Sequence, residues 1–190
     1  QIKEKFGDLL KDAEKGKGFG WLVSKDSYVA YIILMDQFSR HIYRGKGDAF
    51  KNDNGVMIFV ELGWDIYSKQ LKGYEFMFAF MPFMHTENEK YQRKGVNNFE
   101  IHKRLYGNQL QQSRPLTAPI HVSYMGSIDE TTNYDKEYEM LKSMEPHVTG
   151  HQQTIIRFGR FPKRNKALGR ESTPGEIAYM EQPEVQKRPY

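Results

Sequence analysis

The residues best suited to chemistry lie in one basic segment near the end of the chain. Six cations fall within residues 157–170, together with two phenylalanines, two glycines and a proline, and the first acid after them is Glu171. An arginine side chain presents a planar fork of donors that suits a carboxylate or a phosphate. The candidates for binding an anionic ligand in this segment are Arg157, Arg160, Arg164 and Arg170.

Two roles are open for these arginines. In one, they pair with acids elsewhere in the chain (Asp36, Asp53 and Glu87) and clamp the segment onto the rest of the fold. In the other, they bind a small anion. Arg160→Ala is expected to destabilise the protein in both cases, because a buried acid would lose its partner. The phenylalanines are suited to stacking on bases, but no groove motif accompanies them, so we do not expect nucleic-acid binding.

A second polar group follows a strongly apolar run. Asp36 and Arg40 are four residues apart, so on a helix they share a face and can pair, and Gln37 and His41 lie beside them. The simpler interpretation is an ion pair at the edge of the domain. The alternative is that Asp36 orients Arg40 around a ligand, in which case Arg40 and Gln37 are ligand-binding candidates.

Histidines and acids form a third group. His85 and Glu87 follow Pro82, and His151 is a candidate third member. A histidine beside a carboxylate can act as an acid–base pair or bind a metal, so the catalytic candidates are His85, Glu87, His151 and Asp36. If a helix resumes directly after Pro82, His85 and Glu89 also share a face. No His-Glu-x-x-His motif is present, and we predict no metal site. No motif identifies a cofactor.

Composition limits the function classes further. The 190 residues carry a net charge of +4 and contain no cysteine, which excludes disulfides, thiolate zinc sites and cysteine nucleophiles. No apolar run reaches the roughly 20 residues of a membrane span. The sequence shows no signal-peptide pattern, and a targeting segment before Gln1 would be out of sight. We expect a soluble protein of the cytoplasm or an organelle interior. Phosphate-binding loops, dinucleotide fingerprints and nucleophile elbows are absent from the sequence.

The hydrophobic spacing predicts helices throughout. Expected helices cover 2–13, 25–43, 53–67, 73–83, 87–105, 135–144, 148–158 and 174–180, with Ser24 and Thr173 as N-caps. Pro82 is expected to kink or break its helix. Residues 107–134 read as a long irregular connection, with an extended piece at 120–124. We therefore predict one all-α domain over 1–181, with an insertion at about 107–134, and an extended arm over 182–190.

Several motifs resemble a known family in order and spacing. They are Leu34-Met-Asp-Gln-Phe-Ser-Arg-His-Ile-Tyr-Arg-Gly45, Ala49-Phe50 with Asp53, Met81-Pro-Phe-Met-His-Thr-Glu87 with Gln92, His151, Ile156-Arg-Phe-Gly-Arg-Phe-Pro-Lys-Arg-Asn165 and Leu168-Gly-Arg-Glu-Ser-Thr173. They are similar to the family of uncharacterised proteins catalogued as domain of unknown function nine hundred twenty-four, in the tetratricopeptide-like superfamily. The resemblance implies antiparallel helix pairs and supplies no activity.

Two functions remain open on this basis. The favoured one is a tetratricopeptide-like interaction module that binds a protein partner, by analogy of fold alone. The alternative is an enzyme or sensor for a small anionic ligand, with a pocket formed by the arginine, histidine, glutamate and aspartate candidates.

Overall fold

The computed structural model describes residues 1–16, 18–113 and 134–187. Most of these residues are helical, with no strand among them, which confirms the all-α prediction. The α-helices are α1 (Ile2–Glu14), α2 (Lys25–Ile32), α3 (Ser39–Ile42), α4 (Asp53–Tyr67), α5 (Gly73–His85), α6 (Glu89–Ser113), α7 (Tyr134–Phe158), α8 (Pro174–Met180) and α9 (Pro183–Gln186). A π-helical segment, η2 (Ile33–Phe38), joins α2 to α3, and short 3-10 turns are η1 (Phe19–Trp21), η3 (Gly47–Phe50), η4 (Ser68–Gln70) and η5 (Pro162–Arg164).

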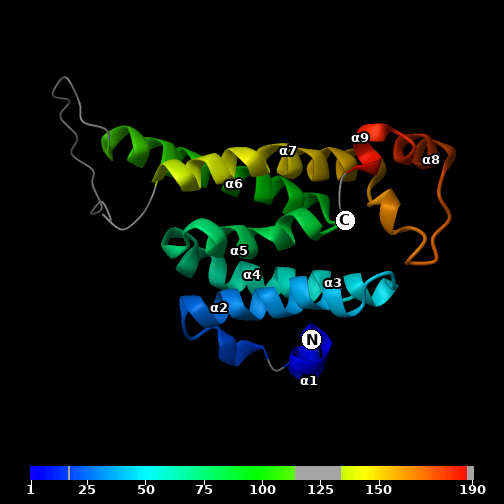
Figure 1. Ribbon diagram of the computed structural model, residues 1–190, viewed down its shortest axis with the longest axis horizontal. Helices are drawn as coiled ribbons and strands as arrows, with labels where there is room; N and C mark the ends of the chain where they lie inside the picture. The colour runs from blue at the N-terminus through cyan, green and yellow to red at the C-terminus, as the bar shows by residue number, and fades with distance from the viewer. Residues whose placement is uncertain (17, 114–133, 188–190) are drawn as a thin grey trace.

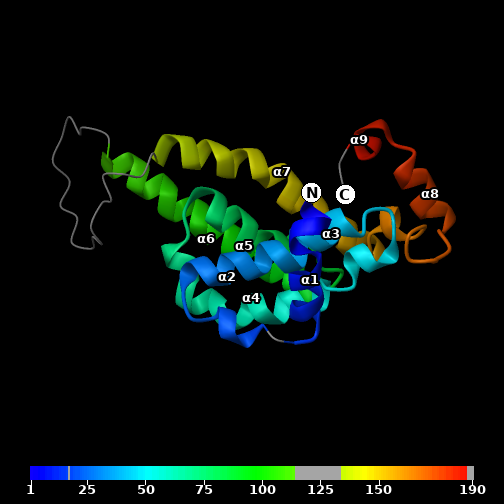
Figure 2. The same cartoon turned by 60° about the horizontal axis from the view of Figure 1, so that its bottom comes forward.

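The helices stack in the order of the chain. Helix α2 packs on α4, α4 on α5, α5 on α6, and α6 on α7, so the molecule is built in layers (Figure 1). Helix α1 lies against η2 and α3, as the turned view shows (Figure 2). After α7 the chain folds back as a C-terminal strap, which we define as residues 159–186. The strap carries η5, α8 and α9 to the end of the stack where α3 lies.

Aromatic side chains fill the spaces between the layers. Trp64 of α4 packs edge-on against Phe83 of α5, with ring centroids 4.9 Å apart. Phe76 and Phe80 stack within α5, and both are fully buried. Burying a side chain of this size contributes about 1.5–3 kcal/mol, so this core holds the layers in register. Gly63 allows α4 to approach α2 closely, because a Cβ there would lie 2.4 Å from the Tyr28 ring.

Two helices are longer than the sequence predicts. Helix α6 continues to Ser113, so the expected irregularity from residue 107 is wrong up to that point. Prolines do not interrupt the helices either: Pro82 lies inside α5 and Pro146 inside α7. A proline inside a helix costs roughly 3 kcal/mol, which the packing of α5, α6 and α7 on one another outweighs. The extended piece expected at 120–124 lies outside the described residues.

The sequence predicts the starts of two helices correctly but not the structure at the C-terminus. Ser24 and Thr173 cap α2 and α8 as expected, each accepting a hydrogen bond from the third residue of its helix. The extended arm predicted over 182–190 is wrong for Pro183–Gln186, which form α9 with Val185 buried, and residues 188–190 lie outside the described residues. No helix within the described ranges has the length and hydropathy needed to cross a membrane.

Candidate functional site

The candidate site begins at the π-helical segment η2. Asp36 lies in this segment and is almost completely buried. A π-turn adds one residue per turn, so some backbone carbonyl groups lose their usual hydrogen-bond donors. The hydroxyl of Ser39 donates to one of them, the carbonyl of Met35, at 2.7 Å. Gln37 donates to Asp36 Oδ2, which fixes the carboxylate from the other side.

Arg40 links Asp36 to the start of α4. Its Nε and Nη2 atoms lie 3.2 and 3.1 Å from Asp36 Oδ1, and Nη2 lies 2.6 Å from Asp53 Oδ1. The predicted Asp36–Arg40 pair is therefore present, and it is buried rather than exposed at an edge. Asp53 is the first residue of α4, where the helix dipole favours a negative charge.

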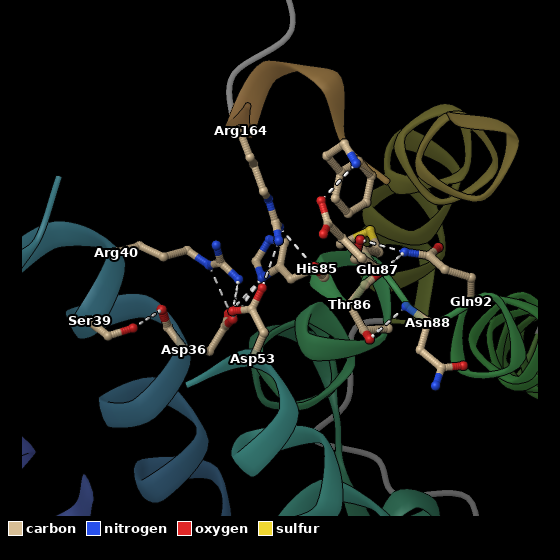
Figure 3. A network of polar contacts seen from close by, with 12 residues as sticks. Asp36, Ser39, Arg40, Asp53, His85, Thr86, Glu87, Asn88, Gln92 and Arg164 are labelled. Carbon is tan, nitrogen blue, oxygen red and sulfur yellow. Dashed lines mark hydrogen bonds and ion pairs between the residues drawn. The ribbon is translucent and has the colours of Figure 1, made fainter. Parts of the chain in front are cut away.

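His85 is the residue that Asp36 holds. It is the last residue of α5, and its Nδ1 atom lies 2.8 and 2.9 Å from the two carboxylate oxygens of Asp36 (Figure 3). A carboxylate only accepts, so Nδ1 carries the proton and donates it, and in the neutral ring Nε2 carries the lone pair. The side chain of His85 is 12 % exposed, and the ring lines a small cavity.

Burial and charge set the protonation of this pair. Burial lowers the pKa of His85, and the nearby Arg40 cation lowers it further, while Asp36 opposes both. For Asp36, burial raises the pKa, but His85 and Arg40 outweigh burial and hold the pKa well below its usual range. At neutral pH Asp36 is therefore ionised and His85 is neutral, with its lone pair on Nε2.

Arg164 brings the C-terminal strap to the same point. Its Nη1 donates to Asp53 Oδ2 and its Nη2 to the carbonyl of His85, both at 2.8 Å (Figure 3). The guanidinium lies between the rings of Phe50 and Phe161, at 4.4 and 4.5 Å from their centroids. Burial lowers the pKa of Arg164 and raises the pKa of Asp53, so each depends on the other to remain charged.

Glu87 holds the strap rather than the cavity. Its carboxylate accepts from the backbone N–H of Phe161 at 2.8 Å and from both Nη atoms of Arg170 at 2.8 and 2.9 Å. Glu87 is not among the residues that line the cavity. The expected approach of Glu89 to His85 does not occur, since α5 ends at His85 and α6 begins only at Glu89.

The remaining arginines serve the strap itself. Arg160 pairs with Glu176 through two hydrogen bonds of 2.7 and 2.9 Å, and Glu176 is buried. The hydrogen bonds from Arg160 lower the pKa of Glu176 to about 2. Arg157 lies apart from this network, with its guanidinium over the rings of Phe158 and Tyr179. The structure thus realises the clamping role for Arg160 and Arg164 and places Arg157 elsewhere.

The cavity beside His85 has a volume of about 60 Å³. His151 lies across from His85, with ring centroids 6.4 Å apart, and its Nδ1 lies 2.6 Å from the His147 carbonyl. Its Nδ1 therefore carries a proton as well. The cavity is lined by His85, Gly150, His151, Thr154, Phe161, Pro162, Lys163, Arg164, Tyr179 and Val185.

Two hydroxyl groups in the cavity wall were missed by the sequence analysis. Thr154 donates to the Gly150 carbonyl at 2.8 Å, so the Tyr179 hydroxyl, 2.9 Å away, donates to Thr154 and keeps its lone pairs. No spacing signal in the sequence points to either residue. Glu176 was visible as part of the capping box after Thr173, but its role as the partner of Arg160 was not.

Within the described parts of the chain, no three His, Asp or Glu side chains gather as a metal site. The fold and the site together define an all-α protein whose strap closes a buried ion-pair cluster over an Asp–His pair. A family model described as bacterial protein of unknown function (DUF924) matches residues 1–184. The chain belongs to this family.

A solved structure shares the fold. It is described as the structure of a protein of unknown function, ATU0120, from Agrobacterium tumefaciens, and it aligns with a TM-score of 0.67 and 24 % identity. The alignment covers 94 % of this chain and 81 % of that chain. No curated protein matches the sequence.

Proposed function

We propose that the cavity at His85 is an acid–base site for a small anionic molecule that bears a phosphate or a carboxylate. One observation carries the proposal: Asp36 holds His85 by Nδ1, while the same ring lines a cavity. An imidazole held by Nδ1 has Nε2 as the ring nitrogen that remains for a ligand in the cavity. The site residues proposed for this role are Asp36, His85 and His151, supported by Gln37, Arg40 and Arg164.

The chemistry follows from the protonation states. Neutral His85 accepts a proton from an O–H, N–H or activated C–H group of the ligand at Nε2. The imidazolium that forms is stabilised by ionised Asp36, whose oxygens lie within 2.9 Å of Nδ1. The lowered pKa of His85 keeps the base form populated at neutral pH. Arg164 holds the backbone of His85 in place through its carbonyl.

The size and lining of the cavity indicate the class of ligand. A single water needs roughly 10–15 Å³, so about 60 Å³ admits a head group of a few atoms and leaves the rest of a ligand outside. Lys163 is one of the residues that line the cavity, and Arg40, Arg160 and Arg164 pair with the acids Asp53 and Glu176. The hydrogen-bond acceptors Nε2 of His85 and Oη of Tyr179 suit a ligand that also carries a hydroxyl group.

Native mass spectrometry tests this proposal. The protein is exposed to a small-molecule extract of cells, and we expect an added mass that is lost on unfolding. His85→Gln should lose this mass, and His41→Gln, a matched change outside the site, should keep it. Equal occupancy in the two variants, or an adduct in neither the variants nor the parent protein, would refute an acid–base site at His85.

A protein-interaction module is a second candidate. What supports it is the stacking of successive helices, as in tetratricopeptide-like proteins, and an apolar stripe on α4. Ile58, Leu62 and Ile66 lie four residues apart and are 56, 47 and 57 % exposed. Such a stripe suits the apolar face of a helix from a partner protein. Affinity capture should then recover a partner that Ile66→Lys loses and His85→Gln retains; recovery of the bare chain alone would contradict it.

A further inference from the structure

A buried tyrosine on the other side of α4 lacks the hydrogen bond that its neighbours make. The hydroxyl of Tyr28 donates to the Val60 carbonyl at 2.9 Å, and that of Tyr67 donates to the Leu22 carbonyl at 2.7 Å. Tyr31 is also buried as a residue, at 6 % exposure, but its hydroxyl makes no such bond to another described residue and is not one of the oxygens sealed from solvent without a partner. This hydroxyl therefore reaches open space, where water or a ligand can be its partner.

The Tyr31 hydroxyl faces a cavity. A Cβ at Gly18 would lie 2.3 Å from this oxygen, and both residues line a hollow of about 300 Å³ between the end of α1 and the face of α4. The apolar part of the lining is Ala13, Met35, Ile58, Phe59 and Leu62. None of the lining residues belongs to the cavity at His85, so the two hollows are separate.

Among the described residues that line the hollow, the two charged groups cancel one another. Glu14 accepts from Lys51 at 3.0 Å and from the side-chain amide of Asn52 at 3.0 Å. An ionic ligand would have to compete with this pair, whereas an uncharged one leaves it intact. Burial also raises the pKa of Tyr31, so its hydroxyl keeps the proton and acts as a donor that needs an acceptor.

We infer that this hollow is a second binding site, for an uncharged and mostly apolar small molecule that carries a carbonyl group. The carbonyl oxygen accepts from the Tyr31 hydroxyl, and the apolar body packs on Met35, Phe59 and Leu62. A volume of about 300 Å³ is at the lower end of the range of small-molecule sites, about 300–1,000 Å³. This site is independent of the acid–base proposal, and either can fail without the other.

A pair of matched probes tests the inference. Acetophenone is a flat apolar molecule with a carbonyl group, and ethylbenzene has nearly the same shape without one. Each is titrated into the intact protein while the methyl resonance of Met35 is followed by NMR. We expect saturable shifts with acetophenone, and weaker binding of acetophenone to Tyr31→Phe by about 2- to 10-fold, the usual worth of one hydrogen bond. Ethylbenzene should bind both forms equally.

A blocking variant provides a second readout. Gly55 lines the hollow, and a Cβ there would meet no atom within 4 Å, so Gly55→Met should fold normally and fill the space. Acetophenone binding should fall at least about tenfold, while Gly7→Met on α1 leaves it unchanged. The inference is overturned if acetophenone gives no saturable shift, which would leave water as the partner of Tyr31. It is also overturned if Gly55→Met or Tyr31→Phe binds as the parent protein does.

Discussion

Two largely buried histidines, His85 and His102, lie in contrasting surroundings. The imidazole of His102 stacks on the Phe76 ring, with centroids 3.5 Å apart and planes 3° apart, and burial alone lowers its pKa to about 3. Burial also lowers the pKa of His85, but there an ionised Asp36 holds one nitrogen, and the ring lines a cavity. His102 is therefore a packing group and His85 an oriented one. Burial does not distinguish the two histidines. What distinguishes His85 is that the Asp36 carboxylate holds its ring beside a cavity.

The largest effect should come from removing the carboxylate that orients His85. Asp36→Ala leaves Arg40 and His85 without their buried acid, which we expect to cost about 3–5 kcal/mol of unfolding free energy. Urea denaturation measures this loss. Asp36→Asn keeps the shape and loses the charge, so it should destabilise the protein too. A loss below about 1 kcal/mol would mean that the cluster is hydrated and the account of its burial is wrong.

The strap should matter to His85 and not to His102. Arg160→Ala leaves the buried Glu176 without its partner and should loosen the strap that forms the cavity wall. Arg157→Ala, the matched change three residues away, removes only contacts with two rings. We expect a clearly lower urea midpoint for Arg160→Ala than for Arg157→Ala, together with a shifted titration of His85 and an unchanged one of His102. Equal midpoints would contradict the clamping role of Arg160.

Acid should destabilise the protein because of His102. The unfolded chain binds a proton at His102 below a pKa of 6.5, whereas the folded protein resists it down to about 3, so stability falls as the pH drops through this window. At pH 5 the loss from this residue is about 2 kcal/mol, since each unit of pKa shift corresponds to 1.36 kcal/mol. His102→Phe should remove this part of the pH dependence in thermal melts. An unchanged slope would show that His102 is not shielded from water.

The smallest loss of stability is expected at an exposed ion pair that has the same four-residue spacing as Asp36 and Arg40. Glu89 and Arg93 form an ion pair four residues apart on α6, as Asp36 and Arg40 do, but their side chains are 49 and 60 % exposed. Glu89→Ala should cost only about 0.3–0.5 kcal/mol, because water and salt screen an exposed pair. Urea denaturation in low and high salt measures it. A cost comparable to that of Asp36→Ala would mean that spacing, and not burial, sets the value of these pairs.

Local signals in the sequence were sufficient for most of the helices. The caps at Ser24 and Thr173 and the apolar spacing of α1 and α4 act within a few residues, so they are readable without the fold. The extent of α6 and the passage of α7 through Pro146 depend on packing between helices, which no local pattern encodes. This is why prolines and glycines misled the prediction there.

The candidate site was predictable only in part. Asp36, Arg40, His85 and Arg164 were recognisable as residue types, and Asp53 as a partner for the arginines. Only the fold brings these residues together: Asp53 and Arg164, for example, are 111 residues apart in the sequence, and the residues of the site lie at the ends of several helices. Thr154 and Tyr179 carry no signal at all, because only the fold brings α8 against α7.

The acid–base site depends on Asp36, which fixes the tautomer of His85 and leaves Nε2 as the base. Long-range proton–nitrogen NMR of the histidine rings at neutral pH tests this most directly, with His85→Gln used to assign the signals. We expect Nδ1 of His85 to be protonated and Nε2 not, and the ring to titrate below 6.5. A protonated Nε2 at neutral pH, or a titration at or above 6.5, would contradict it.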